Sequence, residues 1–151
     1  MIAARAIAGG LAGGVAWLAG MLALFGPAQA LLANPELQSA KFLAVFGSIE
    51  PLPRIASAQW ILPAGIFVIA TIYSLVYRLV RGAFARDTLA VKGAKFGVAA
   101  WALMAPWFEF YLPWNAMWEP WPLVALELAL WLGVMLLVGL AIAFAHEWKR
   151  A

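Results

Sequence analysis

The stretch LVALELALWLGVMLLVGLAIAFA, residues 123–145, decides the class of fold. It exceeds the roughly 20 helical residues that are needed to cross about 30 Å of hydrocarbon, and its only charged residue is Glu127. No regular alternation of apolar and polar residues, which would indicate a strand, runs through it. The stretch therefore predicts a transmembrane helix that carries one acid.

Three further apolar stretches precede it, so the predicted spans cover residues 7–32, 60–80, 96–112 and 123–145. The composition agrees, since 66% of the residues are hydrophobic and 11% are charged, against roughly 45–50% and 25% in soluble domains. GPAQA at 26–30 is typical of a signal-peptide cleavage site, but the apolar run before it is too long for one. We expect an all-α integral membrane protein, a single domain over 1–151 with four transmembrane helices in a compact bundle.

The basic residues fix an orientation for these spans. With four crossings, eight of the ten lysines and arginines fall on the side of both termini, and only Lys41 and Arg54 fall on the other side. The eight are Arg5, Arg78, Arg81, Arg86, Lys92, Lys95, Lys149 and Arg150. Because basic residues concentrate on the cytoplasmic side, we expect a multi-pass protein of the cell inner membrane with both termini in the cytoplasm.

Several classes of site are not predicted. The chain has no cysteine, which excludes disulfides, thiolate metal sites and cysteine nucleophiles. There is no GxSxG, HExxH or phosphate-binding glycine loop, and no basic surface interleaved with aromatic residues that would indicate nucleic acid. His146, the only histidine, lies beside Glu147 at the inner end of the last span, where we expect it to anchor at the interface. The sequence predicts no metal ligand and leaves any cofactor unknown.

Two similar motifs indicate an internal repeat. EPLP at 50–53 and EPWP at 119–122 each precede a predicted span, and GVAW at 14–17 resembles GVAAW at 97–101. The simplest interpretation is a duplicated two-helix unit whose copies run parallel, because two crossings restore the starting side. The two EPxP motifs would then face each other on the outer side.

The two outer connections differ in length. In the first, Asn34, Pro35 and Glu36 are typical of a helix start, and we expect a short outer helix at about 35–46. It is too short to span, so it lies on the membrane surface or covers the bundle as a lid. Two overlapping glycine pairs in the first span, Gly9 with Gly13 and Gly10 with Gly14, predict close helix packing.

The second outer connection, WFEFYLPWNAMWEPWP at 107–122, is rich in tryptophan and has no basic residue. Trp107, Trp114 and Trp118 are typical of the aromatic belt at a membrane interface, and Asn115 lies among them. Glu119 and, in the first connection, Glu50 stand before prolines at helix starts, where a carboxylate is stabilised by the helix dipole.

Two other acids are harder to explain by position alone. Glu127 lies about 8 Å inside its span, counting about 1.5 Å per residue, and Glu109 should reach a similar depth on the antiparallel neighbour. An acid at such depth is costly and indicates either a partner or a function. Three interpretations stay open: an ion pair with Arg54, a site for a ligand or an ion, or carboxylates that reach the lipid interface.

We expect a non-enzymatic membrane protein that binds a hydrophobic or cationic ligand, or a partner membrane subunit, in an outward-facing pocket. The candidate ligand-binding residues are Glu109, Glu127, Arg54, Glu119, Glu50, Trp107, Trp114, Trp118 and Asn115. The alternatives are a small proton-coupled transporter that uses Glu109 and Glu127, or a membrane enzyme acting on lipid or isoprenoid substrates. Expected partners are the lipid bilayer and further copies of the chain or a larger membrane complex.

Overall fold

The computed structural model describes residues 2–148, which form helices and connections without any strand in that range. The first half contains α1 (Ile2–Gly20), η1 (Met21–Phe25), α2 (Gly26–Leu32), α3 (Ala40–Gly47), α4 (Arg54–Ser57), α5 (Ile61–Val80) and η2 (Arg81–Phe84). The second half contains α6 (Leu89–Glu109), η3 (Phe110–Ala116) and α7 (Trp121–Glu147). Lys149 and Arg150, which contribute to the predicted charge asymmetry, lie outside the described residues.

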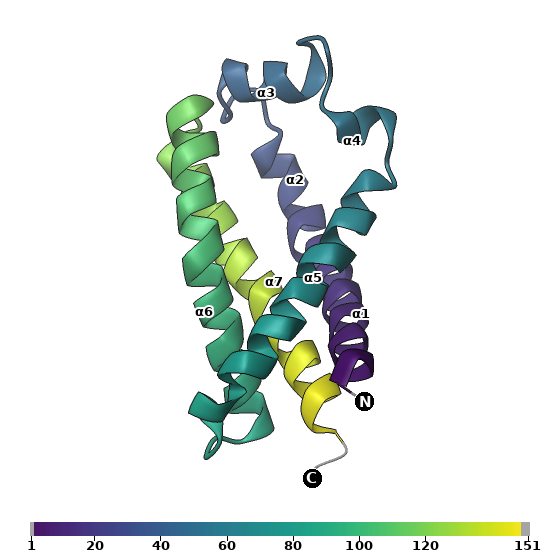
Figure 1. Ribbon diagram of the computed structural model, residues 1–151. Coiled ribbons are helices and arrows are strands. Elements are labelled where there is room, and N and C mark those ends of the chain that lie inside the picture. Colours follow the sequence, from purple (N-terminus) through teal and green to yellow (C-terminus); the bar gives the residue numbers. More distant parts are fainter. Residues whose placement is uncertain (1, 149–151) are drawn as a thin grey trace.

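Four long helical segments run along the molecule (Figure 1). α1, η1 and α2 follow one another without a break, and α1 packs against both α5 and α7, while α6 packs against α7. α1 begins and α7 ends at the same end of the molecule, where α5 also turns into α6 (Figure 1). α3 and α4 lie at the opposite end, which we call the outer end.

Glycines bring the backbones of these helices together. A Cβ added at Gly10 or Gly14 of α1 would collide with Thr71 or Phe67 of α5. A Cβ at Gly97 of α6 would collide with the backbone of Met135 in α7. The glycine pairs of α1 were predicted from the sequence, whereas Gly93 and Gly97 of α6, which have the same spacing, were not.

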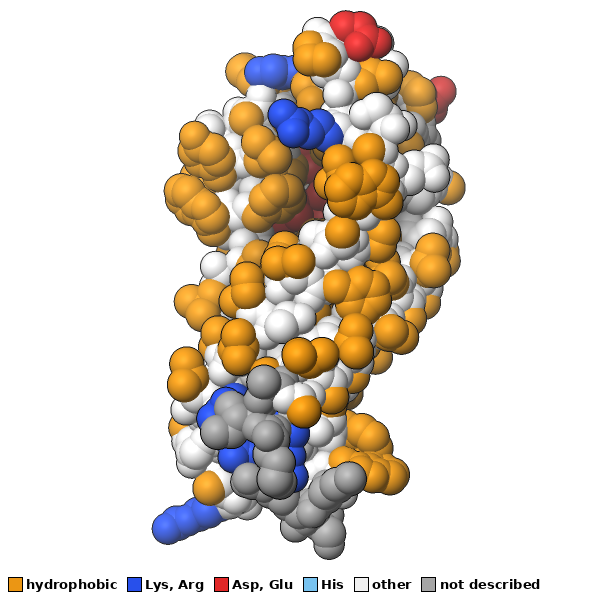
Figure 2. All heavy atoms as spheres, turned by 45° about the vertical axis from the view of Figure 1, so that its right-hand side comes forward, with side chains coloured by type: hydrophobic (Ala, Val, Ile, Leu, Met, Phe, Trp, Pro, Cys, Tyr) orange, Lys and Arg blue, Asp and Glu red, His pale blue; other side chains and the backbone are white. Residues whose placement is uncertain are grey.

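Three helices are long and apolar enough to cross a membrane: Ala4–Leu32, Ile61–Phe84 and Trp121–Glu147. The remaining predicted span, residues 96–112, falls mainly in α6, which does not reach this level of hydrophobicity, since Lys92 and Lys95 lie in the first two turns of this helix. Large hydrophobic side chains of α6 are nevertheless exposed, among them Val98, Trp107 and, at 84%, Leu103. Hydrophobic side chains cover the middle of the face in Figure 2, and charged side chains gather toward its two ends.

The outer helix starts later than predicted. The sequence placed it at about 35–46, whereas α3 begins at Ala40, with the Ser39 hydroxyl accepting a hydrogen bond from the backbone N–H of Phe42. Asn34 forms a local turn instead, because its side-chain oxygen accepts a hydrogen bond from the Glu36 N–H at 2.9 Å. The chain between this turn and α3 is therefore available for contacts with the second half of the molecule.

Candidate functional site

Three acids meet beneath the outer end. Glu109 is the last residue of α6, Glu119 lies in the turn between η3 and α7, and Glu127 lies in the second turn of α7. One carboxylate oxygen from each lies within 4.8 Å of the others. Glu109 is 1% exposed and Glu119 is 2% exposed, while Glu127 is partly buried. The predicted approach of Glu109 and Glu127 is present, and Glu119 joins them.

The local backbone explains how Glu119 reaches the interior. After Glu109 the chain continues as the π-helix η3, a conformation that is frequent at functional sites. Trp118 then adopts φ 60°, a left-handed conformation that is unusual for a bulky residue. The backbone N–H of Glu119 donates to the Pro113 carbonyl at 2.9 Å. This tight turn leaves the Trp118 side chain 75% exposed while its neighbour Glu119 is buried.

Gln38 joins the outer connection to the acids. Its side-chain amide donates to Glu119 Oε1 at 2.5 Å and to the Leu32 carbonyl at 3.1 Å, and the residue is 6% exposed. The neighbouring Ser39 hydroxyl donates to the Met117 carbonyl at 2.6 Å. Gln38 was not predicted as a site residue, because a single glutamine in a polar loop carries no signal for a contact so distant in the chain.

The acids have few partners for their charge. Both oxygens of Glu109 and Oε2 of Glu119 are buried without a hydrogen-bond partner among the described residues. No Lys or Arg in residues 2–148 forms an ion pair with any of the three acids. Burial raises the pKa of Glu119 to about 7, an effect opposed by the Gln38 hydrogen bond and reinforced by the charge of Glu127. Neutralisation must therefore come from protons or from a bound cation.

Glu109 and Glu127 line a cavity of about 130 Å³ whose other walls are mainly aromatic. The aromatic rings come from η1, α3, α6 and α7. They are those of Phe25, Phe42, Phe46, Phe108 and Trp131. Phe42 and Phe46 belong to α3, and their ring centroids lie 5.0 Å apart. α3 therefore covers the acids from above, the arrangement expected of a lid. Figure 2 shows acidic side chains at the bottom of a hollow in the outer half of the molecule.

A second cavity, of about 280 Å³, lies on the solvent side of the acids and is lined by Trp114, Asn115, Trp118 and Glu119. Trp107 lines none of these cavities, because its ring is 66% exposed and stacks on Tyr111. Glu119 lines this second cavity and also belongs to the acid cluster, whose other two members line the aromatic cavity. Three of the predicted tryptophan and asparagine positions therefore lie together, beside one acid of the cluster.

Arg54 and Glu50 are not brought to the acids. Arg54 is exposed at the start of α4 and forms no ion pair within the described chain. Glu50 is also exposed, and its carboxylate accepts a hydrogen bond from the Leu52 N–H at 3.2 Å. The predicted convergence of Arg54 with Glu109 and Glu127 is thus replaced by an all-acid cluster, since Glu119 takes the third position.

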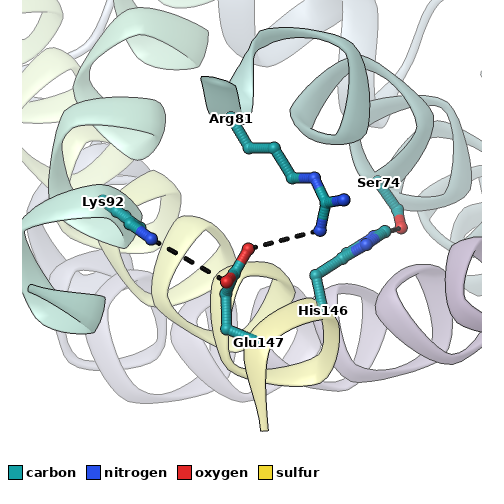
Figure 3. Close-up of polar contacts among 5 residues, drawn as sticks. All are labelled: Ser74, Arg81, Lys92, His146 and Glu147. Carbon is teal, nitrogen blue, oxygen red and sulfur yellow. Dashed lines mark hydrogen bonds and ion pairs between the residues drawn. The ribbon is translucent and has the colours of Figure 1, made fainter. Parts of the chain in front are cut away.

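A separate polar cluster lies at the inner end (Figure 3). Glu147 lies between Arg81 and Lys92, at 3.4 Å and 3.8 Å, and His146 Nε2 lies 2.9 Å from the Ser74 hydroxyl. His146 is only 2% exposed, so it is not the surface anchor that the sequence suggested. These contacts join the end of α7 to α5, η2 and the start of α6. Their role is therefore explained by the packing of the helices.

In the described part of the chain, the acid cluster is the group of side chains best placed to bind a ligand or exchange protons. Three carboxylates close together can share protons, or together they can hold a positive charge. Comparison of the chain with protein-family models, with curated proteins and with solved structures finds no match.

Proposed function

We propose that the chain is an integral membrane protein of the cell inner membrane with four spans and both termini in the cytoplasm. Three helices are apolar enough to span, and α6 packs along the length of one of them, α7. With 21 residues at about 1.5 Å each, α6 has a length of about 31 Å, close to the thickness of the hydrocarbon. Among the described residues, the end with Arg78, Arg81 and Arg86 is the more basic, and this supports the orientation.

Labelling of single cysteines tests this topology. Cysteines placed at Asn115 and at Thr88 should react from opposite sides of intact cells, with Asn115 accessible to a reagent that does not cross the membrane. The cysteine-free chain supplies the control. Equal labelling at both positions would contradict the four-span arrangement.

We further propose that this membrane protein binds a cation through Glu109, Glu119 and Glu127. The proposal rests on Glu109, a carboxylate that is 1% exposed, lies close to two other acids and makes no hydrogen bond through either oxygen within the described chain. An ionised carboxylate in such surroundings is costly unless a positive charge lies beside it. A cation in the adjoining cavity would supply that charge.

The proposal is tested by thermal unfolding of the purified protein in mild detergent, with tetramethylammonium chloride or MnCl₂ added against NaCl of equal ionic strength. A bound cation should raise the stability by about 2.7 kcal/mol at one hundred times its Kd. Glu109→Gln should abolish this stabilisation, and Glu36→Gln, which removes an exposed outer acid, should preserve it. Binding should strengthen from pH 6 to pH 8, because Glu119, whose pKa is about 7, must lose its proton.

A proton-coupled carrier is the second candidate. It is favoured by the position of Glu119, which lines the outer cavity and also belongs to the acid cluster. An acid between two cavities can exchange a proton for a cation as it becomes exposed to either one. Reconstituted vesicles with an imposed pH gradient should then accumulate tetramethylammonium, and Glu119→Gln should abolish the accumulation. Binding without accumulation in the unaltered protein would restrict the function to a binding protein.

A further inference from the structure

We infer that the cation is amphipathic, with an ammonium head in the aromatic cavity between Glu109 and Glu127 and an alkyl chain in a groove between α5 and α6. This inference rests on the proposed cation binding and specifies its ligand class. The inference is based on two cavities that share lining residues. One cavity is acidic and aromatic, and the other is lined by apolar residues.

The head site has the composition that binds an organic ammonium group. The two carboxylates supply negative charge, and the rings of Phe25, Phe42 and Trp131 supply faces for cation–π contacts. Its volume of about 130 Å³ is roughly four times the 30 Å³ that a water molecule occupies in the liquid. A head group with several heavy atoms therefore fits.

The residues that line this cavity are less suited to coordinating a metal ion. Calcium and magnesium take six or more oxygen ligands, and zinc favours nitrogen and sulfur. Of the side chains that line the cavity only Glu109 and Glu127 offer oxygen, Glu119 adds a third carboxylate beside them, and the remaining lining side chains are apolar or aromatic. An ammonium head needs charge and aromatic faces rather than a full shell of oxygens.

The tail site adjoins the head site. A groove of about 460 Å³, within the usual range for ligand pockets, is lined by apolar residues of α1, η1, α4, α5, α6 and α7. Phe108 and Trp131 line both this groove and the acidic cavity. The groove is continuous with the exposed apolar surface of α5, where Leu62 and Ile69 are each 41% exposed. An alkyl chain can therefore lie in the groove while its charged end meets the acids.

Gly65 provides a direct test of the tail site. It lines the groove, and a Cβ added there would have no atom within 4 Å, so a side chain at this position starts in open space and can occupy part of the groove. Binding of radiolabelled decyltrimethylammonium and tetramethylammonium is measured with the protein in lipid nanodiscs, after subtraction of empty nanodiscs. Gly65→Leu should weaken decyltrimethylammonium binding about tenfold, since each displaced methylene is worth about a fourfold change, and leave tetramethylammonium within about twofold.

Two further variants make the result specific. Ile69→Trp fills the groove from the next turn of α5 and should act like Gly65→Leu, whereas Ala64→Leu, at an exposed position that does not line the groove, should change neither affinity. Glu127→Gln should weaken the binding of both ligands. An equal effect of Gly65→Leu on both ligands, or none on the decyl compound, overturns the tail site.

The experiments can contradict the proposed ligand class without contradicting the proposed cation binding. Glutamate-dependent binding of Mn²⁺ without binding of either ammonium compound would leave the proposed function standing and overturn this inference. Absence of any glutamate-dependent cation binding would overturn both. Tight binding of decanol that Gly65→Leu also abolishes, with no dependence on Glu127, would identify the groove as a site for neutral lipid and overturn the inference.

Discussion

The molecule contains two helical hairpins that are built alike and connected differently. The first hairpin consists of α1 with η1 and α2, followed by α5, and the second consists of α6 with η3, followed by α7. In both, glycines of the leading helix lie against the following helix, Gly10 and Gly14 in one and Gly93 and Gly97 in the other. An EPxP motif precedes the following helix in each, yet Glu50 is exposed and Glu119 is 2% exposed.

The difference between Glu50 and Glu119 comes from the connections that hold them. The first connection is long and forms α3 and α4, so its EPxP motif lies at the surface. The second is short, and the turn at Trp118 directs Glu119 toward Glu109 and Glu127. The same motif is thus a surface helix start in one hairpin and part of a buried acid cluster in the other. Glu50 does not join the acid cluster, and the duplication itself stays a prediction.

The largest expected effect distinguishes the packing of the two hairpins. Gly97→Ala should lower the free energy of unfolding by about 3 kcal/mol, because the added methyl group meets the α7 backbone, which cannot move aside cheaply. Gly14→Ala meets the ring of Phe67, a side chain that can rotate, and should cost about 1 kcal/mol. Thermal unfolding in mild detergent measures both changes.

Gly65→Ala is the matched control for these two variants. No atom lies within 4 Å of the position of its Cβ, so it should leave the stability unchanged or raise it by up to about 1 kcal/mol through helix propensity. Similar costs for Gly97→Ala and Gly14→Ala would show that the two hairpins close in equivalent ways.

Much of this architecture is predictable from sequence, because helix length, apolar runs and glycine spacing are local properties. The three most apolar helices and the glycine contacts of α1 follow from such patterns. Membrane insertion of α6 stays a proposal, since Lys92 and Lys95 reduce its hydrophobicity. The approach of Glu109 to Glu127 could be predicted from depth on neighbouring antiparallel helices. Gln38 and the aromatic walls could not, because they depend on how the first connection folds over the second hairpin.

A smaller effect should come from that covering connection. Gln38→Ala removes the amide that donates to Glu119 Oε1 and leaves a buried carboxylate with one contact fewer, which typically costs about 1–3 kcal/mol. Gln59→Ala, at an exposed glutamine near the start of α5, should change the stability by less than about 0.5 kcal/mol. Equal effects in thermal unfolding would mean that the contact between the connection and the second hairpin contributes nothing.

The buried EPxP acid, Glu119, should also make the stability depend on pH. The pKa of Glu119 rises from 4.5 to about 7 in the folded protein, so folding favours its neutral form. Stability should therefore be full below about pH 4.5 and should fall as the pH rises through 7, in the absence of a bound cation. Glu119→Gln should reduce this slope, as followed by melting temperature between pH 4.5 and pH 8. A slope that Glu119→Gln does not alter would place the titrating group elsewhere.

The smallest expected effect concerns Arg54, which follows the exposed EPxP motif. If Arg54 neutralised Glu127, Arg54→Ala would leave a buried carboxylate unpaired and cost about 3–5 kcal/mol, and Glu127→Gln would partly restore the loss. Arg54 is exposed and forms no ion pair in residues 2–148, so we expect a change below about 0.5 kcal/mol. A double-mutant cycle of Arg54→Ala with Glu127→Gln should likewise give a coupling near zero in thermal unfolding. A coupling of several kcal/mol would mean that the long arginine side chain reaches down to the acids, and that the protein carries its own cation. The acid cluster would then need no external charge, because the first hairpin would supply what the second lacks.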